Sequence, residues 1–149
     1  MKILQMQPYI VLDEYRSMKE CFETNWVTEG PKSKEFVSQL CDMVGTKYGV
    51  LAPNGTLALY LGLNSIGVGP GDEVIVPDFT FIASATAVIM AGATPKFVDV
   101  EFDTLQINVE DCKRVLSNKT KAIMPVHMYG ASCDMTKIMC FAEENNLLI

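Results

Sequence analysis

Short apolar segments alternate with helical segments of roughly ten residues along most of this chain, and this alternation constrains the fold more than any other feature. Apolar, mostly β-branched segments predict strands at Glu73–Pro77, 96–100 and 122–127. Helices are expected at 56–66, 80–91, 108–116 and near 135–145, and Asn108 is a candidate cap of the third. A further strand is expected at 48–52, and another is expected to begin at 147–149. Strands that are almost wholly apolar are typical of a parallel sheet covered on both faces. The sequence therefore predicts an α/β fold, a three-layer sandwich with a mostly parallel sheet.

Two more helices are expected before the first strand, at 13–24 and 33–44. In the second of these, Phe36, Leu40 and Val44 recur at helical spacing and mark an apolar side. Ser33, followed two residues later by Glu35, gives this helix a plausible N-cap region.

Charge and cysteine usage exclude several classes of partner. A formal net charge of −6 and a pI near 4.7 argue against nucleic acid, which requires a basic face. One histidine and five cysteines without a C-x-x-C pair argue against a zinc site. We expect reduced thiols in a cytoplasmic protein.

Membrane insertion and secretion are not expected either. No apolar run approaches the roughly 18 residues that a membrane helix needs. The N-terminal segment meets Pro8, Asp13 and Glu14 before any long apolar region, unlike a signal peptide.

The glycine-rich segment at 67–71 is a tempting but incorrect match to a dinucleotide-binding loop. Such a loop needs a strand before it and a helix after it, so that the phosphate meets a helix N-terminus. Here the helix precedes Gly67, Gly69 and Gly71 and the strand follows them. We interpret these glycines as a helix C-cap and a tight turn.

The turn at 53–56 (PNGT) has the order that a phosphate-binding loop requires. It follows an expected strand and opens an apolar helix, so the Thr56 and Leu57 amides are among the unpaired donors of the first helical turn. Gly55 lets a ligand approach the backbone closely. From these four residues alone, an ordinary strand–helix turn capped by Thr56 remains the alternative.

Five blocks, NGTLAL, GVGPGDEVIVPDFTF, AGATPKFVDV, NKTKAIMPVHMYG and CDM, occur in this order along the chain. Together they resemble the DegT/DnrJ/EryC1/StrS family of nucleotide-sugar aminotransferases, which depend on pyridoxal 5′-phosphate (PLP). The similarity begins at Trp26 and favours the perosamine-synthetase-like branch, which aminates C4 of a GDP-linked 4-keto-6-deoxy sugar. It implies the N-terminal part of the large domain of a fold-type I PLP-dependent transferase.

The resemblance implies a cofactor site. Gly55, Thr56 and Leu57 match the phosphate-binding turn of the family, with the Thr56 and Leu57 amides at the PLP phosphate. Phe81 matches the aromatic residue that lies over the PLP ring, where a flat apolar side chain stacks and excludes water. A core position on an apolar helix is the alternative for Phe81.

The resemblance also implies a substrate loop at 26–31, which in the family borders the sugar-nucleotide pocket, often across a dimer interface. Thr28 and Glu29 are the candidate substrate-binding residues there. Residues 1–32 are therefore expected to form an arm and helix beside the pocket, and 33–149 an incomplete large domain without the small C-terminal domain. His127 is interpreted as a strand-end residue near the pocket rather than a catalytic one.

No residue of the chain matches the catalytic residues of the family. In its members the carboxylate for the pyridine nitrogen follows the strand expected at 147–149, and the Schiff-base lysine lies beyond it. None of the ten lysines has the family's S-F-x-x-x-K setting, so we expect weak PLP binding and no activity from these 149 residues alone. The resemblance implies a homodimer with glutamate as the amino donor. Two hypotheses follow. In the first, the chain is a fragment of an aminotransferase, and in one form of this hypothesis a separate chain supplies the remainder. In the second, the chain is a non-catalytic binding or regulatory module.

Overall fold

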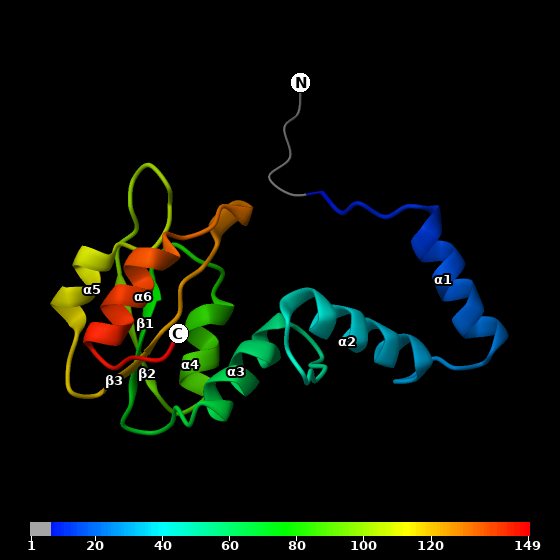
Figure 1. Ribbon diagram of the computed structural model, residues 1–149, viewed down its shortest axis with the longest axis horizontal. Coiled ribbons are helices and arrows are strands. Elements are labelled where there is room, and N and C mark those ends of the chain that lie inside the picture. Colours follow the sequence, from blue (N-terminus) through cyan, green and yellow to red (C-terminus); the bar gives the residue numbers. More distant parts are fainter. Residues whose placement is uncertain (1–6) are drawn as a thin grey trace. The chain divides into compact units, whose positions relative to one another are not determined.

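The computed structural model describes residues 7–149, which divide into two compact units (Figure 1). The N-terminal unit extends to Leu51, and the sheet unit runs from Ala52 to Ile149. Residues 32 and 33 both belong to the helix Pro31–Val44.

The sheet unit is built on three parallel strands, with β1 in the centre of the order β2-β1-β3. Their bounds are Glu73–Pro77 for β1, Thr94–Val98 for β2 and Thr120–Ile123 for β3. Leu148 forms a parallel bridge to Ala122 on the outer side of β3. The strand expected to begin at 147–149 therefore joins the same sheet.

Helices cover both faces of this sheet. Those of one face are α3 (Gly55–Ser65) and α4 (Ala83–Met90); those of the other are α5 (Val109–Val115) and α6 (Met135–Glu144), with the short 3-10 helix η1 (Met128–Gly130) before α6. Val74 and Val76 point into the α3–α4 core, and Ile75 points into the α5–α6 core. Both faces of β1 are fully buried, and every residue of this strand after Glu73 is accordingly apolar. The predicted three-layer α/β fold is confirmed.

Local signals placed most element ends close to their expected positions. Asn108 caps α5 by accepting a hydrogen bond from the Asp111 amide at 3.1 Å, as predicted. Gly67 follows α3 with φ +74°, which confirms the helix C-cap interpretation of the glycine-rich turn. β3 ends at Ile123, earlier than expected, because Pro125 has no amide hydrogen with which to continue a ladder.

The N-terminal unit contains two amphipathic helices, α1 (Leu12–Glu23) and α2 (Pro31–Val44), and neither buries a residue. An ion pair of 2.9 Å joins Lys32 to Glu20. The N-cap of α2 is Gly30, with Pro31 in the first turn, so the predicted N-cap region at Ser33 is wrong. Proline suits the first helical turn, where its missing amide hydrogen has no partner to lose, and it starts the helix before Ser33.

The strand expected at 48–52 does not form, because no strand within residues 7–149 pairs with it. The segment instead runs beside α2. A Cβ atom on Gly49 would come within 3.0 Å of Cys41 Sγ and 3.1 Å of Val37 Cγ1. Apolar composition predicted a strand here, but contact with a helix, rather than a ladder of hydrogen bonds, determines its conformation.

Candidate functional site

The candidate site lies at the carboxyl edge of the parallel sheet, where ligands of open α/β sheets bind. A turn joins the end of α3 to the start of β1, so the helix and the strand run in opposite directions. The N-terminus of α3 therefore lies at the end of the sheet where β1 terminates. The segment from Asp78 to Ile82 follows β1 at this edge, and the segment from Met124 to His127 follows β3. The turn before α3, Phe81 and His127 therefore share one end of the sheet unit.

Asn54 sets the geometry of the turn before α3. Its side-chain Oδ1 accepts a hydrogen bond from the Leu57 amide at 3.0 Å and caps the helix. Thr56, which was the alternative cap, is instead inside the first turn. The Leu57 amide can meet a phosphate only if the Asn54 side chain turns away.

Gly55 and Thr56 offer an open approach to the same helix end. A Cβ atom built on Gly55 would meet nothing within 4 Å, so the space over this backbone is free for a ligand. The Gly55 and Thr56 amides belong to the first helical turn, whose donors have no partner within the helix. The positive end of the helix dipole favours an anion here.

Phe81 is 74% exposed, which excludes the core position considered as its alternative. It lies immediately before α4, in a turn where the hydroxyls of Thr80 and Ser84 are 2.9 Å apart and hydrogen-bonded. A large aromatic ring held at the carboxyl edge without burial is available to cover a planar ligand.

Sequence reasoning missed an aromatic pair at this edge. The rings of Phe79, after β1, and Tyr129, after β3, lie 6.4 Å apart between centroids and are tilted by 54°. Tyr129 has a left-handed backbone with φ +54°, followed by Gly130 with φ +82°. Gly130 was the sequence signal for this turn, because glycine readily adopts a positive φ. The left-handed backbone of Tyr129 is uncommon for a non-glycine residue and could not be read from the sequence.

Thr28 and Glu29 lie in the loop between α1 and α2 of the N-terminal unit. The Trp26 indole Nε1 donates a hydrogen bond of 2.9 Å to the Glu29 carbonyl oxygen. Glu29 also lines a groove along α2 that includes Ser33 and Lys34. The two candidate substrate residues thus share one loop, in a different unit from Gly55 and Phe81.

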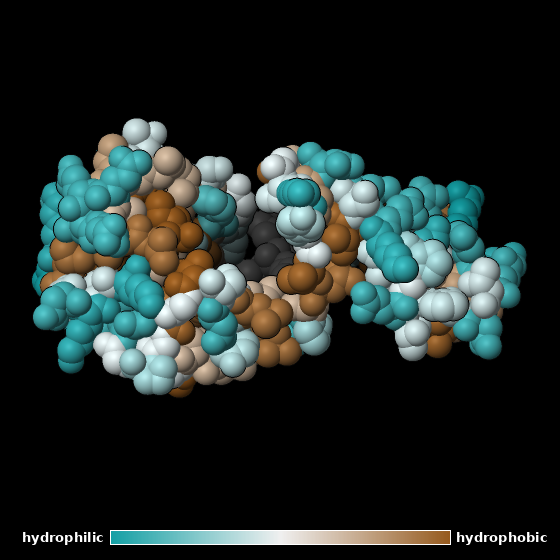
Figure 2. Space-filling view, turned by 60° about the horizontal axis from the view of Figure 1, so that its bottom comes forward, coloured by the Kyte–Doolittle hydropathy of each residue, from teal (hydrophilic) through white to brown (hydrophobic). Residues whose placement is uncertain are grey.

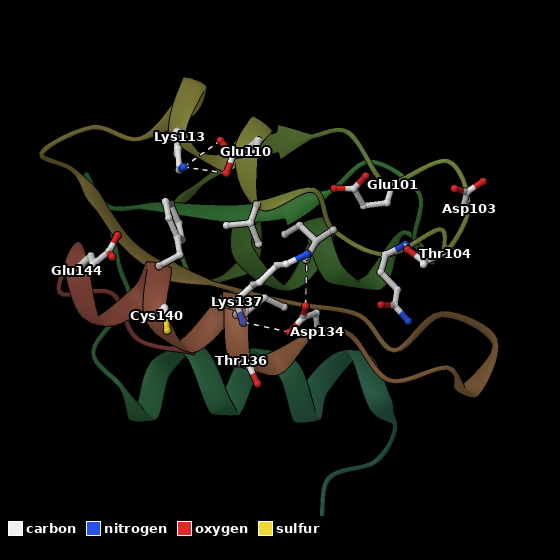
Figure 3. Close-up of a pocket in the computed structure, with 15 residues that line it drawn as sticks. Glu101, Asp103, Thr104, Glu110, Lys113, Asp134, Thr136, Lys137, Cys140 and Glu144 are labelled. Carbon is white, nitrogen blue, oxygen red and sulfur yellow. Dashed lines mark hydrogen bonds and ion pairs between the residues drawn. The ribbon is translucent and has the colours of Figure 1, made fainter.

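A second groove, of about 600 Å³, lies between α5 and α6 and contains none of the expected site residues (Figure 3). Its lysines are already paired, Lys113 with Glu110 at 2.8 Å and Lys137 with Asp134 at 3.5 Å. Within residues 7–149, no group of three or more His, Cys, Asp and Glu side chains could hold a metal ion.

Comparison with known proteins agrees with this geometry. The family model described as the DegT/DnrJ/EryC1/StrS aminotransferase family matches residues 8–149. The chain belongs to this aminotransferase family. It is 44% identical over 131 residues to the GDP-perosamine synthase of Caulobacter vibrioides, covering 87% of this chain and 35% of that protein.

Solved structures of aminotransferases show the same fold. The aminotransferase from Psychrobacter cryohalolentis matches with a TM-score of 0.88 and 39% identity over 94% of this chain and 36% of that one. The chain spans between 35% and 40% of the length of the curated relatives that it matches. In residues 7–149, none of the helices has the length and hydrophobicity needed to span a bilayer.

PLP is the cofactor of this aminotransferase family. NtdA from Bacillus subtilis, solved with the pyridoxamine form (PMP) bound, matches with a TM-score of 0.83 and 29% identity over 98% of this chain and 36% of that one. The open space over Gly55 and the exposed ring of Phe81 fit a phosphorylated planar ligand. To reach the Leu57 amide, such a ligand would have to displace the Asn54 cap.

Proposed function

We propose that this chain is the N-terminal part of a nucleotide-sugar aminotransferase that transfers an amino group from glutamate to a GDP-linked 4-keto-6-deoxy sugar. The observation that carries the proposal is the family match over residues 8–149, together with 35–44% identity to three GDP-perosamine synthases. The open carboxyl edge of the sheet, with Gly55 and Phe81 beside it, supports the same reaction class.

In this proposal the chain supplies one side of the cofactor pocket. The amides of Gly55 and Thr56 hold the phosphate, the Thr56 hydroxyl adds a donor, and the Leu57 amide joins them when Asn54 turns away. The Phe81 ring covers one face of the pyridine and excludes water from it. The bound cofactor supplies the electron sink for amino transfer, and the protein supplies orientation and charge.

We further propose that residues 1–32 form an arm beside the sugar-nucleotide pocket, with Thr28 and Glu29 as substrate ligands, and that 33–149 belong to the large domain. The lysine that carries the cofactor and the carboxylate for the pyridine nitrogen belong to family sequence outside the matched region. The working protein is proposed to be a cytoplasmic homodimer.

The test is an amino-transfer assay on the protein produced from the complete reading frame. It is incubated with PLP, a GDP-linked 4-keto-6-deoxy sugar and ¹⁵N-glutamate, and the sugar nucleotide is analysed by mass spectrometry. We expect a product that has gained one ¹⁵N amino group, and no turnover by the 149 residues expressed alone. Binding of the sugar nucleotide without any ¹⁵N transfer by the complete protein would contradict the proposal and favour a non-catalytic binding module.

A further inference from the structure

His127, the only histidine of the chain, is held in one orientation by the segment that follows it. Its Nδ1 accepts a hydrogen bond of 3.0 Å from the backbone amide of Cys133. The Cys133 thiol donates in turn to the Val126 carbonyl oxygen at 3.1 Å. These two hydrogen bonds join the two ends of the segment 126–133, which therefore forms a closed loop beside the imidazole.

A buried side chain fixes this loop to the rest of the sheet unit. Gln106, only 8% exposed, donates from Nε2 to the carbonyl oxygens of Ala131 at 3.1 Å and Ser132 at 2.7 Å. The ring contact between Tyr129 and Phe79 joins the loop to the end of β1. The orientation of His127 therefore depends on contacts within its own loop and with two other parts of the unit, Gln106 and Phe79.

The Cys133 contact determines which ring nitrogen of His127 carries the proton. A backbone amide can only donate, so Nδ1 must be the unprotonated nitrogen. In the neutral imidazole the hydrogen then lies on Nε2, which is left as a donor on the opposite side of the ring. The loop thus produces a histidine with one fixed hydrogen-bond donor.

That donor belongs to the edge at which the cofactor is proposed to bind. His127 is exposed and lines a groove of about 470 Å³ together with Ala58 and Leu59 from the first turns of α3. Met124 and Pro125, which follow β3, line the same groove. The groove runs from His127 along α3 between Ala58 and Ile66, and Gly55 and Thr56 are not among its lining residues. His127 shares the carboxyl edge with the first turn of α3 because it follows the end of β3.

We propose that His127 is a positioning residue that donates its Nε2 hydrogen to an anionic oxygen of the phosphorylated pyridine cofactor. This inference rests on the proposed function, because it assigns a further contact to the same cofactor. The cofactor carries two kinds of anionic oxygen, on its phosphate and on its ring, and both accept a hydrogen bond from a neutral N–H.

The first measurement is the tautomer of His127 without any ligand. Because the chain has one histidine, protein labelled with ¹³C,¹⁵N-histidine gives a single imidazole in a solid-state NMR spectrum, whatever its state of association. Nδ1 is identified through Cγ and Nε2 through Cδ2. We expect the proton on Nε2; a proton on Nδ1 in the neutral ring would overturn the proposal.

The second measurement is the response of this imidazole to ligands. Pyridoxamine 5′-phosphate is the probe because, unlike PLP, it has no aldehyde to react with lysines. It should shift the Nε2 resonance, and comparison with pyridoxamine and with inorganic phosphate identifies the ring oxygen or the phosphate as acceptor. If the probe perturbs Gly55 and Thr56 but leaves Nε2 unmoved, the proposal for His127 fails while the proposed function stands. If a saturating concentration of the probe perturbs neither, the proposals for His127 and for the phosphate site at Gly55 and Thr56 both fail.

Variants provide a readout that does not depend on the spectrum. His127→Phe keeps a planar ring without a donor and should weaken binding of pyridoxamine 5′-phosphate on the order of tenfold. His127→Gln retains a terminal N–H and should recover part of the loss. Cys133→Ala keeps the backbone amide and is the matched control for the loop. Equal affinity in the Phe variant and the parent, both folded, would contradict the proposal.

Discussion

At the scale of single residues, the candidate site depends on which groups the fold has already used. Asn54 occupies the Leu57 amide, whereas Gly55 remains open and Phe81 remains exposed. Gly55 and Phe81 therefore fit a cofactor in their present conformation, whereas the Leu57 amide becomes available only when the Asn54 side chain moves.

Removing the aromatic ring at the carboxyl edge should weaken cofactor binding without affecting the fold. In the protein from the complete reading frame, Phe81→Ala should lower PLP retention about fivefold, because a stacking contact contributes roughly 1 kcal/mol. Thr56→Val should also lower it by removing a hydroxyl donor. Retention is measured by dialysis and absorbance. The control is Phe102→Ala, since Phe102 is 94% exposed on another turn; equal losses in Phe81→Ala and this control would contradict the assignment.

Asp111 gives the fold a defined acid sensitivity. The Arg114 guanidinium, followed by the backbone amide of Asp99, lowers the pKa of this carboxyl from 3.8 to about 2. The carboxylate therefore stabilises the fold above pH 3.8, and its contribution is lost as the pH falls toward about 2. In Asp111→Asn, the free energy of unfolding should be lower at neutral pH and should vary less across that interval, as measured by urea unfolding.

The matched control for this carboxyl lies on the same helix. Glu110→Gln removes an exposed ion pair with Lys113, and such pairs contribute little. An identical loss of acid sensitivity in the Glu110 and Asp111 variants would show that Asp111 has no special role.

At the scale of elements, helix ends both support the fold and delimit the site. The Asn54 cap fixes the start of α3, and the loop after β3 is fixed by Gln106 and Cys133. The α3 cap rests on one side-chain hydrogen bond, so a single substitution tests it, whereas four hydrogen bonds hold the loop after β3.

Removing the cap of α3 should separate stability from phosphate binding. Asn54→Ala should lower the free energy of unfolding by about 1 kcal/mol, because an amide of the first turn loses its acceptor. Affinity for pyridoxamine 5′-phosphate in the folded variant should stay equal or rise, since the Leu57 amide becomes free. Denaturant unfolding and a binding titration measure the two effects. Asn54→Ser should restore stability; a fall in affinity with Ala would show that Asn54 itself holds the ligand.

The sequence predicted best those elements in which the pattern of apolar residues reflects burial of the element itself. β1 is apolar between the turn at Gly71 and Pro77, and the structure gives it the predicted bounds. The segment 48–52 has a similar composition but no neighbouring strand, and hydrogen-bonded pairing is a property of partners that a single segment does not encode. At the site, the Phe79–Tyr129 contact and the His127–Cys133 bond join residues through tertiary structure, so periodicity could not reveal them.

At the scale of the whole molecule, hydrophobic residues reach the surface in both units (Figure 2). Tyr15, Met18 and Phe22 are more than half exposed on α1, and Phe81 and Ile82 are exposed before α4. Large exposed apolar patches mark interaction surfaces or sites of aggregation.

We therefore expect the 149-residue chain to associate in solution. Light scattering after size-exclusion chromatography should give a mass above 16.5 kDa, with a broad denaturant transition. The three parallel strands should still form, which circular dichroism can follow. A monodisperse monomer with one sharp cooperative transition would contradict this expectation.

The central claim is that the carboxyl edge of the sheet, rather than the groove between α5 and α6, holds the cofactor end of a sugar aminotransferase site. Hydrogen–deuterium exchange with and without pyridoxamine 5′-phosphate tests it directly, because peptide masses are read whether or not the protein associates. The account predicts slower exchange in peptides covering 54–60 and 79–86, with the α5–α6 groove unchanged. Protection confined to 101–113 and 134–144, which line that groove, or no protection at saturating ligand, would contradict it.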